Sequence, residues 1–403
     1  MGGLTRVRVV GPLEEFAEGF RADLAGLGYS PRTSEAQLYL MKHLSGWLMA
    51  RGLAVGDLTM GMVEEFLIAR RGRYSNLRSV RALAPLLRYL RSRGAVPAVP
   101  TVPPVGAANV LTHRFATYLS TQQGLAPETV RSYTSQVRLF LDRYAGVEGG
   151  WGSLTAGQVT DFVTDRAAAQ RPGSVAVGAN ALRTLLRWMW REQILSASLA
   201  DSVGSVAACT GAVVPRALSR DQVRDVFGAL PDVGPVRLRD EAMLALMYRL
   251  GLRAGEVASL RLEDMDWRTE VLVVRGKGGR LDQLPLPVDV GKLLAGYLRR
   301  GRPEPTAHRQ VFLAVDAPHD ALAGSAVTNV VSRALFRAGI GGSGAAHRLR
   351  HTTACRVVAQ GGGLVEAGQL LRQASPASTA IYAKADLCVL AVLARPWPVE
   401  VIL

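Results

Sequence analysis

Three basic side chains in the carboxyl-terminal part of the chain are spaced so that they could bind one phosphate group. Arg253 follows Gly251, a residue type that commonly ends a helix. Its guanidinium could therefore hold an oxyanion through two parallel hydrogen bonds. His347 and Arg350 lie three positions apart in the segment HRLRH, so both would share one face of an expected helix. The set indicates chemistry at a phosphodiester.

Two further residues could take part in that chemistry. Lys277 lies in a glycine-rich turn, GKGG at residues 276–279, where a flexible ammonium group could reach a leaving oxygen. Tyr382 lies in the polar segment STAIYAKAD, and neighbouring cations would favour its phenolate and so activate it as a nucleophile. Each residue taken alone is also compatible with an ordinary surface or structural role.

Metal binding is disfavoured by the residues around the histidines. His347 and His351 are four positions apart and could share a zinc ion, but the glutamate of an HExxH motif is absent. Arg350 would repel a cation, and no third ligand is evident. The turn at Lys277 is not a Walker loop, because no Ser or Thr follows the lysine. We expect neither a metal nor another cofactor.

The composition indicates a globular protein with a polyanionic partner. Of 403 residues, 48% are hydrophobic and 20% are charged, which excludes an intrinsically disordered chain. The net charge of +15 favours nucleic acid over an anionic membrane, since no apolar segment is long enough to span a bilayer and no export signal is recognisable. Three widely spaced cysteines exclude a disulfide framework, and we expect a cytoplasmic protein.

Proline- and glycine-rich segments predict three domains. Four prolines within residues 95–107 forbid a helix there. This segment should form an extended linker that reaches up to about 40 Å. Residues 203–216 are rich in Gly, Ala and Ser and predict a second linker. We therefore expect a helical module at 1–94, a second helical module at 108–202 and a catalytic domain at 217–403.

The first two modules resemble copies of one another. The segment Gly28–Thr33 returns 96 positions later as Gly124–Thr129, and Leu58-Thr59 returns as Leu154-Thr155. Each copy ends in a similar amphipathic helix with arginines opposite an apolar stripe. We expect two four-helix modules in series.

The third domain should be mainly helical with one hairpin. Ser219 and Gln222 fit a capping box that starts a helix. An apolar helix at 241–250 ends at Gly251, and residues 270–287 alternate as two strands around the GKGG turn. The predicted fold class is mainly α with a small antiparallel β-sheet in the C-terminal domain.

In this order, the motifs resemble those of the tyrosine recombinase, or phage integrase, family from about residue 109 to the end. The first box of that family, roughly GLRxxEL, is matched by residues 251–257, which contain Arg253 and Glu256. The lysine box is matched at Lys277, the HxLRH box at residues 347–351 and the nucleophile box at residues 378–382. Residues 108–202 resemble the family's core-binding, SAM-like domain, and the first module would be an additional one.

One position departs from the family pattern. Members usually carry His or Trp nine residues before the tyrosine, in a phrase such as LLGHS, whereas this chain reads LLRQA at residues 370–374. The amide of Gln373 can donate a hydrogen bond, but it cannot carry charge or transfer a proton. Loss of a transition-state donor can cost about 10²-fold in rate. The departure leaves open a slow enzyme or a catalytically silent one.

The resemblance implies a site-specific recombinase that needs neither ATP nor a metal. Arg253 and Arg350 would hold the scissile phosphate, and Tyr382 would attack it to form a 3′-phosphotyrosine bond. Lys277 would protonate the departing 5′ oxygen. The supporting residues would be Glu256, His347, His351 and Gln373.

The resemblance also implies partners and leaves alternatives open. Double-stranded DNA would be clamped by the second and third domains, and the assembly would be a homotetramer or a hetero-assembly with related recombinases, in the cytoplasm at the nucleoid. Three other functions are considered: a type IB topoisomerase-like enzyme, a catalytically weakened DNA-binding accessory subunit, and a helical protein–protein scaffold. The net charge of +15 disfavours the last of these.

Overall fold

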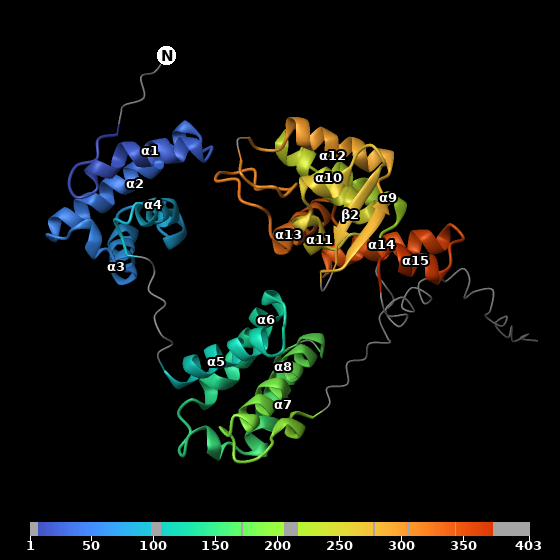
Figure 1. Cartoon of the computed structure of the whole chain (residues 1–403), viewed down its shortest axis with the longest axis horizontal. Helices are drawn as coiled ribbons and strands as arrows, with labels where there is room; N and C mark the ends of the chain where they lie inside the picture. Colours follow the sequence, from blue (N-terminus) through green and yellow to red (C-terminus); the bar gives the residue numbers. More distant parts are fainter. Residues whose placement is uncertain are drawn as a thin grey trace, which may run out of the picture. The chain divides into compact units, whose positions relative to one another are not determined.

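The computed structural model describes residues 7–97, 106–170, 172–204, 217–276, 279–304, 306–342 and 344–373. The chain divides into two units, one made of residues 1–98 and 214–403 and the other of residues 99–213. Figure 1 colours the helices and strands by their position in the sequence. The described residues form three large hydrophobic clusters, which lie within 7–96, 108–203 and 218–349. No helix in the described ranges is both long and apolar enough to cross a membrane.

The first 97 residues contain a bundle of four helices. Their starts are set by capping residues, because the hydroxyl groups of Ser30, Thr59 and Ser79 each accept a hydrogen bond from a backbone N–H three residues further on. Val96 is buried in the same core, so the folded module extends into the segment expected to be a linker. The helices are α1 (Ala17–Gly26), α2 (Pro31–Ala50), α3 (Met60–Arg71) and α4 (Val80–Ser92).

The second helical region repeats this arrangement. Pro31 and Pro127 open equivalent helices, and Thr59 and Thr155 cap equivalent ones, so the offset of 96 residues in the sequence is also an offset of helix starts. The fourth helices differ, because α8 has 20 residues and α4 has 13. The helices are α5 (Ala107–Thr121), α6 (Pro127–Tyr144), α7 (Ala156–Ala169) and α8 (Pro172–Arg191).

The last region is also mainly helical. The predicted capping box is confirmed, since Ser219 Oγ accepts from the Gln222 N–H and Gln222 Oε1 accepts from the Ser219 N–H, both at 3.1 Å. The apolar helix begins at Pro235, six residues before the sequence predicted, because proline suits the first turn of a helix. The helices are α9 (Arg220–Gly228), α10 (Pro235–Arg249), α11 (Ala254–Ser259), α12 (Val288–Arg300), α13 (Gly324–Arg337), α14 (Ala345–Ala359) and α15 (Leu364–Leu370).

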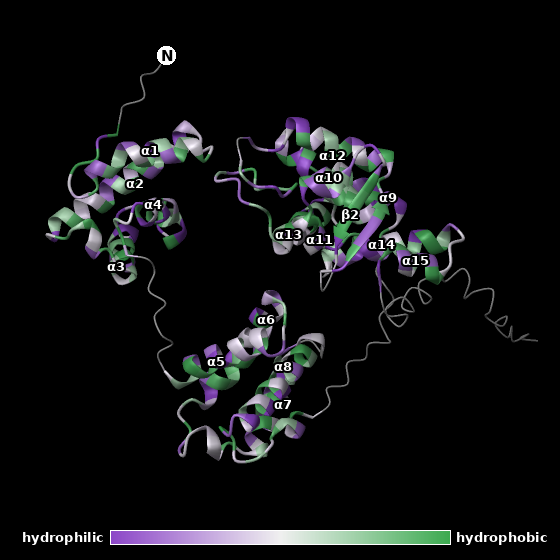
Figure 2. Cartoon of the chain, in the orientation of Figure 1, coloured by the Kyte–Doolittle hydropathy of each residue, from purple (hydrophilic) through white to green (hydrophobic). Residues whose placement is uncertain are grey.

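One antiparallel sheet accompanies these helices, in the order β1 (Met265–Asp266), β2 (Val271–Arg275) and β3 (Leu281–Pro285). Leu272 and Val274 face the core, and Leu272 pairs with Leu284 across the two longer strands. Figure 2 colours β2 as mostly hydrophobic. The predicted hairpin and the predicted fold class are confirmed. The two-residue strand β1 was not predicted, because it is too short to show an alternating pattern.

Helix α10 lies at the centre of the last region and holds the helix that carries the histidine motif. It packs against α12 and α14. The hydroxyl of Thr353 on α14 donates to the Tyr248 carbonyl of α10 at 2.7 Å. The neighbouring Thr352 hydroxyl accepts from the Leu218 N–H at 2.8 Å. Both threonines are buried, so these bonds fix the depth and rotation of α14.

Candidate active site

The first site element is the junction between α10 and α11. Gly251 has a φ of +62°, and a Cβ at this position would collide with the Leu371 side chain. Glycine is therefore required both by the backbone conformation and by the close approach of a distant segment. Two residues later, Arg253 is the N-cap of α11. The turn at Gly251 thus places Arg253 at the N-terminal end of α11.

Arg253 is held by Glu256. The Arg253 backbone N–H donates to Glu256 Oε2 at 2.8 Å, and its Nη1 donates to Oε1 at 2.7 Å. The Arg253 side chain remains 42% exposed, while that of Glu256 is 5% exposed. The carboxylate is therefore a buried anchor, and the guanidinium it orients faces solvent.

A second arginine, Arg372, meets the same carboxylate from another part of the chain. Its Nη2 donates to Glu256 Oε2 at 2.6 Å, and both side chains are about 95% buried, with relative exposures of 4% and 5%. The backbone of Arg372 has a φ of +53°, in the left-handed region that favours glycine. The buried ion pair compensates for this uncommon conformation, and it joins the end of α15 to α11.

Arg350 joins the same two segments through their backbones. From α14, its Nη1 donates to the Gly251 carbonyl and its Nη2 donates to the Leu371 carbonyl. The residue is 4% exposed. Arg350 and Arg372 thus both connect the Gly251–Glu256 segment with the end of α15, one through carbonyl groups and the other through a carboxylate.

The charge on Glu256 is maintained by its neighbours. Burial by itself raises the pKa of this carboxyl group, but the Arg253 N–H, the positive charge of Arg372 and the Arg253 guanidinium outweigh burial and hold the pKa below its ordinary value. Glu256 is therefore ionised at neutral pH.

The two histidines lie on α14 with different surroundings. His347 is exposed, His351 is half-buried, and their ring centroids are 6.4 Å apart. Burial lowers the pKa of His351, and the nearby His347 and Arg350 lower it further. A neutral imidazole at this position can accept or relay a proton at physiological pH.

Of the eight residues that the sequence singled out, six lie in the described part of the chain. The contacts above bring Arg253, Glu256 and Arg350 together with the segment that ends at Gln373. Gln373 is half-buried, and its backbone N–H donates to the Gly368 carbonyl at 3.0 Å. Lys277 and Tyr382 lie outside the described residues. Between β2 and β3, the Gly276 N–H donates to the Arg280 carbonyl at 2.7 Å.

Sequence reasoning missed Arg372. The signal was present, because this arginine occupies the place of glycine in the family phrase LLGHS. The difference from that phrase therefore spans three adjacent positions, Arg372, Gln373 and Ala374. The arrangement as a whole can bind and polarise an anion through Arg253, with a rigid second layer behind it.

The chain is similar to known integrases and recombinases. Residues 216–387 match the family model of the phage integrase family, and residues 112–193 match that of the phage integrase N-terminal SAM-like domain. The relative "Putative integrase/recombinase y4rA" of Sinorhizobium fredii is 34% identical to this chain. The alignment covers 97% of this chain and 96% of the relative. Tyrosine recombinase XerD of Ralstonia nicotianae is 32% identical over 67% of the chain and 87% of its own length.

Solved structures share the fold. The XerH site-specific recombinase in a post-cleavage complex with its difH substrate aligns with a TM-score of 0.58 at 15% identity, over 82% of this chain and 93% of its own. A lambda integrase fragment bound to a core site aligns with a TM-score of 0.53 at 17% identity, over 71% of this chain and 96% of its own. Fold and sequence together define a DNA recombinase. The chain belongs to the tyrosine recombinase, or phage integrase, family, whose members cut and rejoin DNA.

Replacing Gly251 with alanine should destabilise the site by about 2 kcal/mol or more, because the residue needs a positive φ and Leu371 fills the space of a Cβ. Hydrogen exchange of the α11 and α15 amides in the full chain measures this change. Gly255→Ala is the matched control, since nothing lies within 4 Å of its Cβ position in α11. Equal protection in the two variants would contradict the role of Gly251.

Replacing Glu256 with glutamine should lower stability by about 3 kcal/mol at neutral pH, because the buried charge of Arg372 loses its partner. The folded-state pKa of Glu256 lies below its ordinary value of 4.5, so its contribution is complete above that value and is lost as the pH falls through the lowered one. Urea unfolding at pH 7 and at about pH 3 should show a gap between parent and variant that shrinks in acid. A gap independent of pH would argue against the ion pair.

Proposed function

We propose that this chain is a site-specific DNA recombinase that works through a 3′-phosphotyrosine intermediate. The observation that carries the proposal is that Glu256 orients Arg253, while Arg350 and Arg372 join the Gly251–Glu256 segment to the end of α15. An anion site of this kind suits a phosphate whose charge increases in the transition state. The matched family range, residues 216–387, includes positions 277 and 382 and supports the remaining roles.

The proposed reaction begins with Tyr382. Its phenolate oxygen attacks the scissile phosphorus in line, the bond to the 5′ oxygen breaks, and Lys277 gives that oxygen a proton. Arg253 donates to the non-bridging oxygens, and the buried Arg350 adds its positive charge to the site while its Nη atoms hold the Gly251 and Leu371 carbonyls. Attack on the phosphotyrosine by the 5′-hydroxyl of a partner strand then restores a phosphodiester and frees the phenol, so no external energy source or metal ion enters the balance.

The other residues have supporting roles in this proposal. His351, whose lowered pKa keeps it neutral, and the exposed His347 would move protons between the phenol, the lysine and solvent. Gln373 would donate its amide to the phosphate. Glu256 and Arg372 are positioning residues, because they act on the phosphate only through Arg253 and the α15 segment.

The proposed partner is duplex DNA. The lambda integrase and XerH structures are complexes with a core site and with difH, respectively, and this chain has the same fold. We propose a clamp formed by residues 108–202 and 217–403, a tetramer on the recombining sites, and a location in the cytoplasm at the nucleoid. An accessory subunit without activity and a topoisomerase-like enzyme are the alternatives that the following experiments distinguish.

Replacing Tyr382 with phenylalanine should abolish covalent capture of DNA and leave binding unchanged, because only the nucleophilic oxygen is removed. The substrate is a duplex that contains the target site and is nicked beside the cleavage point. Denaturing gels measure the adduct, and Tyr248→Phe serves as a control in the same domain. A surviving adduct would identify another nucleophile. Binding without capture by the parent protein would favour the accessory subunit, and relaxed plasmid without recombinants would favour a topoisomerase.

Replacing Gln373 with histidine should raise the single-turnover cleavage rate by up to about 10²-fold, because a stronger transition-state donor is restored. Gln373→Ala, which removes the amide, should lower the rate and provides the comparison. A large loss of rate in the histidine variant would mean that the amide is fitted to a different geometry beside Arg372.

A further inference from the structure

The first helical module contains an uninterrupted basic region. Residues 66–97 include eight arginines and no aspartate or glutamate. In the fold these residues form the end of α3, the following turn and α4. Four of the arginines, which we call the arginine surface, are exposed around that turn: Arg71, Arg73, Arg78 and Arg81.

These four arginines form a group of neighbouring positive charges with no acidic partner among the described residues of the module. Within the described residues, none of the four forms an ion pair with a carboxylate. Six other arginines in the described parts of the two modules do have an acidic partner; the pairs are Arg21–Glu18, Arg51–Glu65, Arg114–Glu192, Arg131–Glu128, Arg138–Asp142 and Arg143–Asp165. Four like charges on one turn repel each other, so the arrangement favours an anionic partner from outside the module.

The turn that carries this charge is built by a fifth arginine. Arg70 is 6% exposed, and its Nε donates to the Leu77 carbonyl at 3.0 Å. Its Nη1 lies 2.8 Å from His43 Nδ1, and its guanidinium carbon lies 4.4 Å from the centroid of the Tyr74 ring. The arginine surface is therefore displayed on an ordered backbone and not on a loose loop.

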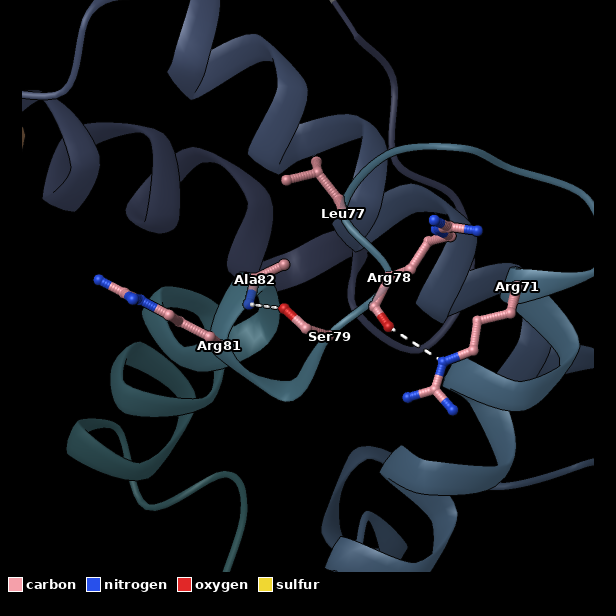
Figure 3. A pocket seen from close by; sticks show the side chains of 6 residues that line it. All are labelled: Arg71, Leu77, Arg78, Ser79, Arg81 and Ala82. Carbon is pink, nitrogen blue, oxygen red and sulfur yellow. Dashed lines mark hydrogen bonds between the residues drawn. The ribbon is translucent and has the colours of Figure 1, made fainter. Parts of the chain in front are cut away.

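Three of the four arginines border an open hollow of about 660 Å³, which is lined by Arg71, Leu77, Arg78, Ser79, Arg81 and Ala82. Figure 3 shows the Arg71 and Arg81 side chains on either side of Ser79, with the Nε of Arg71 bonded to the Arg78 carbonyl at 3.3 Å. Guanidinium groups placed in this way can contact successive phosphates of a polyanion, and they offer no donor pattern that reads a base sequence.

We propose that the arginine surface binds the phosphate backbone of duplex DNA, so that the first module adds contacts of its own to those of the other two domains. The choice of DNA as the polyanion rests on the proposed function. The lack of acidic partners for these arginines is observed in the described part of the structure and does not depend on that function. The module lies before the range that matches the SAM-like domain, and the alignment with the Sinorhizobium fredii relative covers 97% of this chain. The predicted binding is independent of base sequence and strongly salt-dependent.

The experiment compares two double variants of the full chain, each also carrying Tyr382→Phe so that cleavage cannot interfere. Arg78→Gln with Arg81→Gln removes two charges from the arginine surface. Arg21→Gln with Arg51→Gln removes two paired charges from the same module. Fluorescence anisotropy with a mixed-sequence duplex of about 60 base pairs, between about 50 and 200 mM salt, gives the affinity and its salt dependence.

We expect the first variant to bind about 10- to 100-fold more weakly and to reduce the slope of log K against log salt by about 1.8, since each phosphate contact contributes about 0.9. The control should keep the parent slope, and Arg78→Lys with Arg81→Lys should restore it. Equal slopes in the two glutamine variants would overturn the proposal. So would a loss of binding to phosphatidylserine vesicles with DNA binding intact. Because the assay reads binding alone, a failure of covalent capture at Tyr382 would leave this test valid.

Discussion

The carboxylate of Glu256 is the point on which the catalytic region depends. It accepts from the backbone and side chain of Arg253 within its own helix and from Arg372 at the end of α15, which is 116 residues away in the sequence. A buried ion pair of this kind gains little over a well-packed apolar pair, but the loss of one partner is costly because a charge is left in a low-dielectric interior. The main role of the carboxylate is therefore to fix where α11 and the end of α15 meet, and its net contribution to the free energy of unfolding is smaller.

Parts of the site followed from sequence because they rest on local rules. The left-handed glycine at 251, the capping box at Ser219 and the hairpin each depend on residues close together in the chain. The role of Arg372 does not, since nothing local dictates that an arginine should adopt a φ of +53° or that its side chain should turn inward. Likewise, the core-facing positions of β2, Leu272 and Val274, are set by what packs on the sheet, and Val96 is buried by its module's core despite the neighbouring prolines.

Arginine serves three physical purposes in this chain. Buried guanidiniums at Arg70 and Arg350 donate to backbone carbonyls and fix turns or helix ends. Arg372 neutralises a buried carboxylate, and Arg253 is oriented by that carboxylate while it stays accessible. The exposed arginines of the α3–α4 turn have no carboxylate partner among the described residues of their module. Some of the positive charge in the net +15 thus belongs to arginines that stabilise the fold, and some belongs to exposed arginines that are accessible to an anion.

The most direct measurement is a double-mutant cycle between Glu256 and Arg372. The opening free energies of the α11 and α15 amides would be compared, by hydrogen exchange, in the parent, Glu256→Gln, Arg372→Gly and the double variant. Glycine relieves the strain of the positive φ at position 372 in the single Arg372→Gly variant and in the double variant alike. This backbone effect therefore cancels, and the cycle isolates the side-chain interaction. We expect a coupling free energy of about 2 kcal/mol or more between the two side chains. Additive changes would contradict it, because Glu256 would then not hold the two segments together.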